Sequence, residues 1–405
     1  MVEFLTSTVE LPGWLAWTVA ALVSAVLILN VIAGGALAFI WAERKVSARI
    51  QDRLGPTRTG GRFGWLQSVA DGIKLLAKED LMPEGADGLL FKLAPYVSFC
   101  ASFCAFIALP FAFDVVGQRL NVAVFFVVAV LGLEVFGVIL AGYASASKWS
   151  LFGAMREAAQ VVSYEVPLGM CVVVPVMLAG SMDMVTIAEK QAGWFWNWYL
   201  FHDPFTFIVF WVYVTCAVAS VNRAPFDLAE AESELVAGFH TEYSGLRWSY
   251  FFMAEYGSMY LVSAMAAVLF LGGWNGPIPV ATLLGLSEGT GDTAPYLVRL
   301  LGLVNLVGKA SLGVIIMMWI RWTLPRLRID QVMTTCLKYC TPIAAVMFAG
   351  AMLWKITLPG GLMPGVGRPG GEIREGWLEG PGGRAAAKPA AEDQKVARAP
   401  REAAS

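Results

Sequence analysis

Eight long runs of apolar residues constrain this chain more than any other feature of its sequence. Each has about 20 residues, the length that a helix needs to cross roughly 30 Å of hydrocarbon. Strands of a membrane barrel would alternate apolar and polar residues, and these runs do not. The 405 residues are 57% hydrophobic and only 15% charged, which excludes an ordinary soluble domain. We therefore predict an all-α, polytopic membrane protein with about eight transmembrane helices, near 14–41, 89–113, 122–146, 158–178, 205–221, 248–273, 296–320 and 339–358.

Basic residues are divided unevenly between the connections of these spans. The connections after the first, third, fifth and seventh spans contain most of them, whereas the opposite connections contain Arg119 and Lys190, with Arg299 at a boundary. Because lysine and arginine stay on the cytoplasmic side, this bias places the N-terminus on the periplasmic side. We expect residues 1–358 to form one transmembrane domain. The Gly-, Pro- and Ala-rich residues 359–405 are expected to be a disordered tail.

The cytoplasmic connection at 222–247 is strongly acidic. A helix would spread carboxylates at alternate positions around its whole circumference, so no single face can hold them all. Like charges this close raise one another's pKa values. The connection is therefore either a solvated acidic loop at the membrane edge or a proton-handling, ligand-lining loop. Its charged residues of interest are Arg223, Asp227, Glu230, Glu232, Glu234 and Glu242.

The first cytoplasmic connection, 42–88, is the longest. Glu43 and Arg44 end the first span, and Gly55-Pro56 forces a turn soon afterwards. Residues 63–79 then repeat apolar side chains at helical spacing, with polar residues on the other side. This segment is too polar to span, so it is predicted to lie in the interface plane. It would serve as a membrane anchor, or as a lid or wall for a lipid-derived ligand.

Five ionisable residues lie inside or at the rim of the predicted spans. Each costs about 2.5–3.5 kcal/mol at the bilayer centre on insertion scales, so each suggests a function. Glu157 has the alternative role of a carboxylate at a helix start, where the helix dipole favours it. With the acidic loop, the others could form a polar file across the membrane. The five residues are Glu134, Glu157, Glu165, Glu255 and Lys309.

Other chemistry has little support in the sequence. Cys100 and Cys104 are one helical turn apart, as are Cys336 and Cys340, a spacing that does not supply a four-ligand metal or cluster site. We find no phosphate loop, dinucleotide fingerprint or nucleophile elbow. The chain alone is therefore expected to hold no metal, nucleotide or redox centre.

Several segments carry a resemblance to a known family. Asn222-Arg-Ala-Pro-Phe-Asp-Leu-Ala-Glu-Ala-Glu-Ser-Glu-Leu-Val-Ala-Gly238 is the most specific of them. In these segments the chain resembles the family of the H subunit, the membrane quinone-tunnel component of the proton-pumping NADH–quinone oxidoreductase, respiratory complex I. It departs from the family at Thr57, Ser68 and His240, and it has an additional residue at Gly61-Arg62. The resemblance covers about residues 15–358, and its remaining segments are 43–56, 66–80, 156–165, 242–245, 253–256 and 319–330.

The resemblance implies a site for quinone, which this chain would enclose in a narrow tunnel. The connections 42–88 and 222–247 would form the quinone-side face, and the interfacial helix would form the entrance from the lipid. Carried over by motif, the residues that line the tunnel and its mouth are Arg44, Gln51, Arg53, Asp71, Lys74, Arg223 and Phe226.

Given this quinone site, we hypothesise that a chain of carboxylates couples quinone reduction to proton translocation. Arg156 and Arg223 would act as counter-ions. FMN and iron–sulfur clusters are expected in partner subunits of the peripheral arm, and further membrane subunits would continue the path. A bacterial inner membrane is the expected location. The residues of this hypothesis are Glu43, Glu134, Glu157, Glu165, Asp227, Glu230, Glu232, Glu234, Glu242, Glu255 and Lys309.

Three other functions fit parts of the sequence. A membrane anchor subunit of an energy-converting hydrogenase is related, but the motifs at Glu43–Lys45 and Arg223–Gly238 favour the quinone branch. A stand-alone ion transporter would usually show inverted repeats, and the two halves of the chain show no such symmetry. A purely structural anchor does not explain the intramembrane charges.

Overall fold

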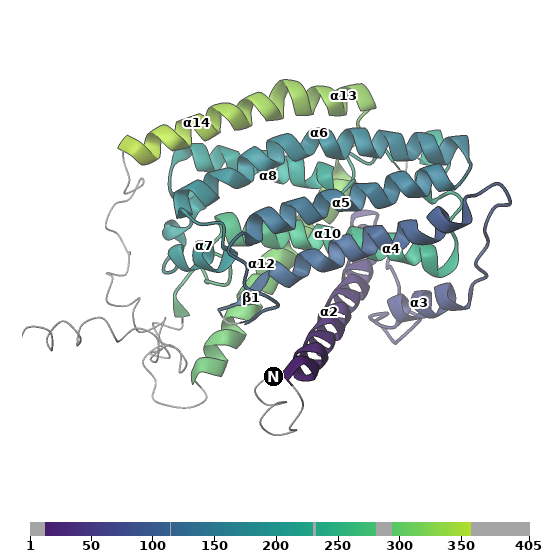
Figure 1. Cartoon of the computed structure of the whole chain (residues 1–405), viewed down its shortest axis with the longest axis horizontal. Helices are drawn as coiled ribbons and strands as arrows, with labels where there is room; N and C mark the ends of the chain where they lie inside the picture. Colours follow the sequence, from purple (N-terminus) through teal and green to yellow (C-terminus); the bar gives the residue numbers. More distant parts are fainter. Residues whose placement is uncertain (1–12, 114, 230–231, 281–293, 358–405) are drawn as a thin grey trace, which may run out of the picture.

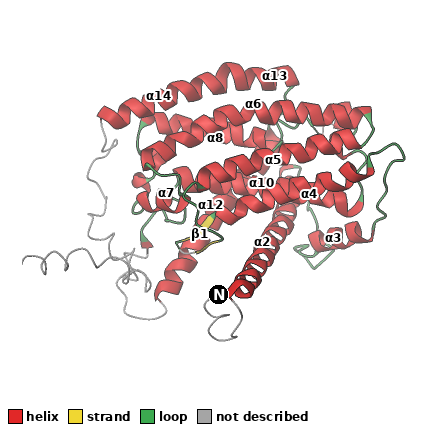
Figure 2. Ribbon diagram, in the orientation of Figure 1, coloured by secondary structure: helices red, strands yellow, loops and turns green. Residues whose placement is uncertain are grey.

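The computed structural model describes residues 13–113, 115–229, 232–280 and 294–357. The tail at 359–405 and Glu230 lie outside these residues. Helices account for nearly all of the regular structure in the described part of the chain, and Figure 2 shows them with one short strand labelled. The prediction of an all-α, polytopic membrane protein is therefore confirmed. Its orientation in the membrane stays a prediction.

Seven helices in the described residues are long and apolar enough to cross a membrane. They correspond to α2 (Gly13–Ile50), α4 (Gly88–Ala105), α5 (Ala123–Ala144), α6 (Lys148–Ala179), α10 (Gly245–Phe270), α12 (Ala294–Thr323) and the unit that ends with α14 (Thr341–Thr357). The fifth predicted span is the shorter helix α8 (Pro204–Ser220), of 17 residues. At 1.5 Å per residue, α8 is about 26 Å long, slightly less than the hydrocarbon thickness.

The second predicted span ends earlier in the structure. The span predicted at 89–113 is helical only to Ala105, and after the 3₁₀ turn η1 (Phe106–Ala108) the strand β1 (Pro110–Ala112) pairs antiparallel with β2 (Val115–Val116). Proline disfavours helical backbone in the residue before it, and Leu109 is extended.

The helix that contains the span predicted at 158–178 begins ten residues before it, because α6 starts at Lys148. Glu157 therefore lies more than two turns inside the helix, and its interpretation as a helix-start carboxylate is wrong. The apolar run is interrupted by Arg156 and Glu157, although the helix continues through them.

The last predicted span also begins earlier in the structure. A continuous helical unit consists of α13 (Ile329–Thr334), the π-helical segment η5 (Thr335–Cys340) and α14. It packs along α6 and α8, at the top of Figure 1.

Helix α10 is the centre of the bundle. Most of its residues are buried, and it contacts α2, α4, α8 and α12. Helices α4, α5, α6 and α8 follow one another in a layer, each packed on the next (Figure 1). The interfacial segment is the short helix α3 (Gln67–Ala77), which contacts α2 and α10 and lies apart from the main layer (Figure 1).

The remaining short elements lie in the connections. Between α6 and α8 are α7 (Met184–Lys190), η2 (Phe195–Asn197) and η3 (Tyr199–Phe201). The acidic connection between α8 and α10 contains α9 (Glu232–Leu235) and η4 (Gly238–His240). Helix α7 and helix α3 lie at opposite ends of the molecule in Figure 1, as expected for connections on opposite sides of a membrane.

Candidate functional site

Arg223 is the centre of a buried ionic cluster. It follows α8 directly and is only 3% exposed. Its Nε lies 2.7 Å from Oε1 of Glu255 on α10, and its Nη1 donates to both carboxylate oxygens of Glu43 on α2, at 3.2 Å each. Its guanidinium lies over the ring of Tyr256, 4.6 Å from the ring centroid. Burial alone would lower the pKa of Arg223, but the nearby Glu255 and Glu43 carboxylates raise it overall. The guanidinium is therefore held in its charged form.

Glu43 joins two further residues to this cluster. The Tyr256 hydroxyl donates a hydrogen bond to Glu43, and Nη1 of Arg321 on α12 forms an ion pair with it. We call Glu43, Arg223, Glu255, Tyr256 and Arg321 the Arg223 cluster. Its two cations and two carboxylates balance when both acids are ionised. Because a buried charge without its partner is costly, protonation of either acid changes the balance of the whole cluster.

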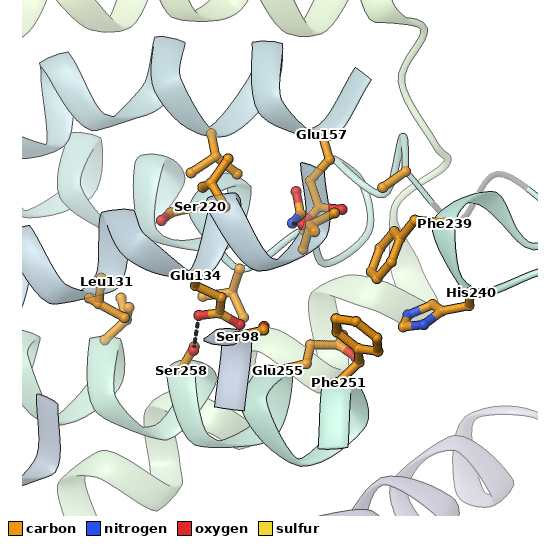
Figure 3. A pocket seen from close by; sticks show the side chains of 17 residues that line it. Ser98, Leu131, Glu134, Glu157, Ser220, Phe239, His240, Phe251, Glu255 and Ser258 are labelled. Atoms are coloured by element: carbon orange, nitrogen blue, oxygen red, sulfur yellow. Dashed lines mark hydrogen bonds between the residues drawn. The ribbon is translucent and has the colours of Figure 1, made fainter. Parts of the chain in front are cut away.

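A cavity lined by both polar and apolar side chains adjoins the cluster inside the bundle. Its volume is about 50 Å³, and since a water molecule needs only about 10–15 Å³ measured in this way, it has room for more than one. Figure 3 shows the side chains of Glu134, Glu157 and Glu255 around it. They come from α5, α6 and α10 respectively, so the cavity depends on the packing of these three helices.

Neutral polar side chains donate hydrogen bonds to two of the three cavity carboxylates. Ser258 donates to Oε2 of Glu134 at 2.5 Å, and Ser102 is 3.4 Å from the same oxygen. Nδ2 of Asn222 donates to Oε1 of Glu157 at 2.7 Å. Hydroxyl and amide groups stabilise a carboxylate without neutralising it, so these acids can exchange protons with cavity water.

Glu255 connects the cluster to the cavity. It pairs with Arg223 and also lines the cavity. His240 lies at one end of the cavity beside Phe239 and Phe251 (Figure 3). Glu255 therefore belongs both to the Arg223 cluster and to the lining of the cavity that Glu134 and Glu157 share.

Acidic residues of the connection at 222–247 form ion pairs with arginines outside this cavity. Nη1 of Arg156 lies 2.6 Å from Oε2 of Glu234, and this hydrogen bond, with the Arg156 charge, lowers the pKa of Glu234. Asp227 lies 3.8 Å from Arg326, whose Nε also donates to the Asp227 carbonyl oxygen at 2.6 Å. Asp227 and Glu234 are thus placed by different arginines. Glu242 is half-buried, and the side chain of Glu232 lies outside the described residues, as does Glu230.

The residues expected to line a quinone tunnel differ in their exposure and in the partners that they contact. Arg44 forms an ion pair with Asp71 of α3, and Lys74 Nζ is 3.8 Å from the same carboxyl group. Gln51 accepts a hydrogen bond of 2.8 Å from Arg53 Nε, and both are exposed after the end of α2. Arg223 is in the cluster. Phe226 is buried and packs edge-to-face on Tyr164, with ring centroids 5.5 Å apart.

Two of the intramembrane residues lie away from the cavity lining. Lys309 Nζ donates to the carbonyl oxygens of Leu271, Gly273 and Asn275, just after α10 ends. Since Glu255 is 16 residues before Leu271, Lys309 lies about 24 Å farther along α10. Glu165 is half-buried on α6, close to Gly132 of α5. The structure therefore brings together Glu134, Glu157 and Glu255 but not Lys309.

Sequence reasoning missed the partners of these acids. Arg321 ends a span and Tyr256 follows Glu255, so both lay in segments that already carried the family resemblance. Asn222 begins the acidic motif. Ser102 and Ser258 offered no signal, because serine is common in membrane helices and its role here depends on which helix faces it.

Comparisons with known proteins cover the whole of this site. A family model described as NADH dehydrogenase matches residues 23–352. The H subunit of NADH-quinone oxidoreductase from Anaeromyxobacter dehalogenans is 42% identical over 357 residues, 86% of each chain. The H subunit from Chlorobium luteolum is 46% identical over 322 residues, 79% of this chain and 85% of the relative. That from Geobacillus kaustophilus is 42% identical over 350 residues, 85% and 96% respectively.

Proposed function

This chain belongs to the NADH dehydrogenase family, as a membrane subunit of NADH–quinone oxidoreductase (complex I), and we propose that it encloses the quinone tunnel and couples quinone reduction to proton translocation. Quinone is the substrate of the complex. The proposed tunnel wall is formed by Arg44, Gln51, Arg53, Asp71, Lys74, Arg223 and Phe226, on the face made by residues 42–88 and 222–247. The family assignment favours this function over the hydrogenase anchor and the stand-alone transporter.

The double role of Glu255 is the observation that carries the proposal. Quinone reduction takes up two electrons and two protons, so negative charge develops near the quinone before protons arrive. Such charge would attract the guanidinium of Arg223, which is buried and permanently cationic. Attraction to the quinone would weaken the ion pair between Arg223 and Glu255. Glu255 would then take up a proton more easily, because an opposite charge nearby favours the ionised carboxylate.

The cavity then provides the route by which the proton moves. Glu134, Glu157 and Glu255 line one space that can hold water, and through this water a proton taken up by one acid would reach the others. Glu165 and Lys309 are proposed as more distant members of the path toward neighbouring membrane subunits. Asp227, Glu230, Glu232, Glu234 and Glu242 are proposed as the cytoplasmic acids that deliver protons, with Arg156 as a counter-ion.

We place FMN and the iron–sulfur clusters in peripheral-arm subunits, which bring electrons to the quinone. This chain itself contributes binding, positioning and proton transfer, in the manner of a subunit without a redox centre. It is a multi-pass membrane protein, and we propose the bacterial inner membrane, with the N-terminus on the periplasmic side.

The test is the Glu255→Gln variant in the intact complex. Glutamine keeps the size of the side chain but cannot carry the proton, so NADH-driven reduction of a short-chain quinone should fall on the order of 100-fold. NADH oxidation by an artificial acceptor that bypasses quinone should stay unchanged, as should assembly on a native gel. Glu189→Gln in α7, which lies outside the cavity lining, is the matched control. Full quinone reductase activity in Glu255→Gln would contradict the proposal.

A further inference from the structure

A groove on the outer surface of the bundle is separate from the Arg223 cluster and the cavity. It lies between the C-terminal parts of α2 and α12 and has a volume of about 450 Å³. Val46 and Ile50 of α2 form one wall, and Ile315, Ile316 and Trp319 of α12 form the other. Ile50, both α12 isoleucines and Trp319 are exposed. The groove is therefore an open, apolar concavity of the size that holds a small ligand.

Two cations border this apolar groove. Lys45 and Arg49 are one helical turn apart on α2, so they are on the same face of the helix. The surface that they contribute to the groove is apolar, so their methylene stems line it while their charged ends lie beyond it. Lys45 Nζ donates to the Pro56 carbonyl oxygen at 2.7 Å, which places it at the end of the helix, and Arg49 is exposed in the last turn.

The groove is on the outer face of the helix that carries Glu43. Lys45 is two residues after Glu43, which turns it about 200° around the helix axis. Glu43 faces inward to Arg321 of α12, while Lys45 faces the groove. A ligand in the groove would therefore contact the same helix pair as the Glu43–Arg321 ion pair, from its other side.

We propose that this groove binds one anionic glycerophospholipid of the surrounding bilayer. The phosphate would lie between Lys45 and Arg49, and the acyl chains would lie on the isoleucines and Trp319. Basic pockets between transmembrane helices at the cytoplasmic surface favour anionic headgroups, and both cations are at the end where basic residues accumulate. A quinone tail or a neutral lipid would use the apolar wall but not the cations. The bound lipid links α2 to α12 and stabilises their contact.

The experiment is native mass spectrometry of the intact, delipidated complex with added dioleoyl-phosphatidylglycerol or dioleoyl-phosphatidylcholine. The complex should retain one phosphatidylglycerol more tightly than phosphatidylcholine. Arg49→Gln should weaken that retention about fivefold, the factor expected from one cation at a membrane surface. Lys92→Gln, an exposed lysine near the start of α4 and outside the groove, is the matched control and should retain the lipid fully.

A second variant tests the location without changing charge. Ile316→Trp fills the groove and should reduce retention of phosphatidylglycerol, together with its stabilising effect on the melting temperature of the complex. Equal retention of the two lipids, or unchanged retention in Arg49→Gln, would overturn the proposal. So would unchanged retention in Ile316→Trp, or a quinone or polypeptide held in the groove in place of the phospholipid.

Discussion

At the scale of single residues, the important acids differ in how their charge is compensated. Glu43 meets two arginines and a tyrosine hydroxyl, whereas Glu134 meets two serine hydroxyls. The first arrangement holds a carboxylate ionised, and the second leaves it able to take up a proton. The same residue type therefore serves for charge balance at one position and for proton transfer at another.

The Tyr256 hydroxyl should be needed to hold Glu43 in place. Tyr256→Phe removes its hydrogen bond to a buried carboxylate, which costs about 1.5–3 kcal/mol. We expect a lower temperature of thermal inactivation and a lower rate of quinone reduction. Tyr250→Phe, on the same helix but outside the cluster, should change neither. If both variants behave alike, the hydroxyl has no special role.

The ion pair between Arg156 and Glu234 should make a small, pH-dependent contribution to stability. Because Arg156 lowers the pKa of Glu234 in the folded chain, the contribution is complete above about pH 4.3, where a free glutamate titrates, and is lost as the pH falls through the lower folded value. Glu234 is more than half exposed, so the coupling should be no more than about 1 kcal/mol.

A double-mutant cycle with Arg156→Gln and Glu234→Gln measures this coupling from thermal inactivation at several pH values. Under the proposed function, Glu234→Gln also lowers quinone reduction without loss of assembly. A coupling that grows as the solution becomes more acidic would contradict the predicted sign.

At the scale of elements, the site depends on close approach of helices. A Cβ atom on Gly142 of α5 would lie 2.3 Å from Cβ of Ala154 on α6, and one on Gly137 would lie 2.7 Å from the Ser98 backbone nitrogen of α4. These glycines let α5 pack directly on both neighbours, as small residues commonly do between membrane helices. That packing brings Glu134 of α5 and Glu157 of α6 to the same cavity.

Gly142→Ala should therefore be destabilising even though it adds one methyl group. Overpacking of this kind costs about 1–3 kcal/mol. Thermal inactivation of the purified complex measures the loss. Gly169→Ala in α6 is the control, because a Cβ atom there meets nothing within 4 Å. Equal stability of the two variants would show that α5 can move away from α6 at little cost.

At the scale of the whole molecule, the connections are separated into two ends. Helix α3 and the acidic connection lie at one end, where we propose the quinone-side face. The Arg119–Asp183 ion pair joins the β2–α5 connection to α7 at the other end (Figure 1). The excess of basic residues at the first end predicts that it faces the cytoplasm.

Labelling of single introduced cysteines tests this orientation. Lys78→Cys and Asn121→Cys replace exposed residues at the two ends. A membrane-impermeant maleimide should label Lys78→Cys only in inside-out vesicles and Asn121→Cys only in right-side-out ones. The unaltered chain, whose own Cys100 is exposed, gives the background. The reverse pattern would invert the predicted topology.

The sequence by itself determined the fold class and the family. In lipid, every backbone polar group must be satisfied within the chain, so long apolar runs without alternation can only be helices. The motif at 222–238 was specific enough to identify the family, and the intramembrane positions of Glu134 and Glu255 marked them as functional candidates.

Only the tertiary structure decided which of these residues act together. Glu43 and Arg223 are 180 residues apart in the chain, and their contact depends on how α2 and α10 pack around the end of α8. Hydropathy also did not give the start of α6 or the end of α4, because it reports transfer into lipid and not the hydrogen bonds that continue or end a helix. The Arg223 cluster exists because burial requires each charge to find a partner, and helix packing selects that partner. Packing likewise decides which hydroxyl and amide groups meet the cavity acids.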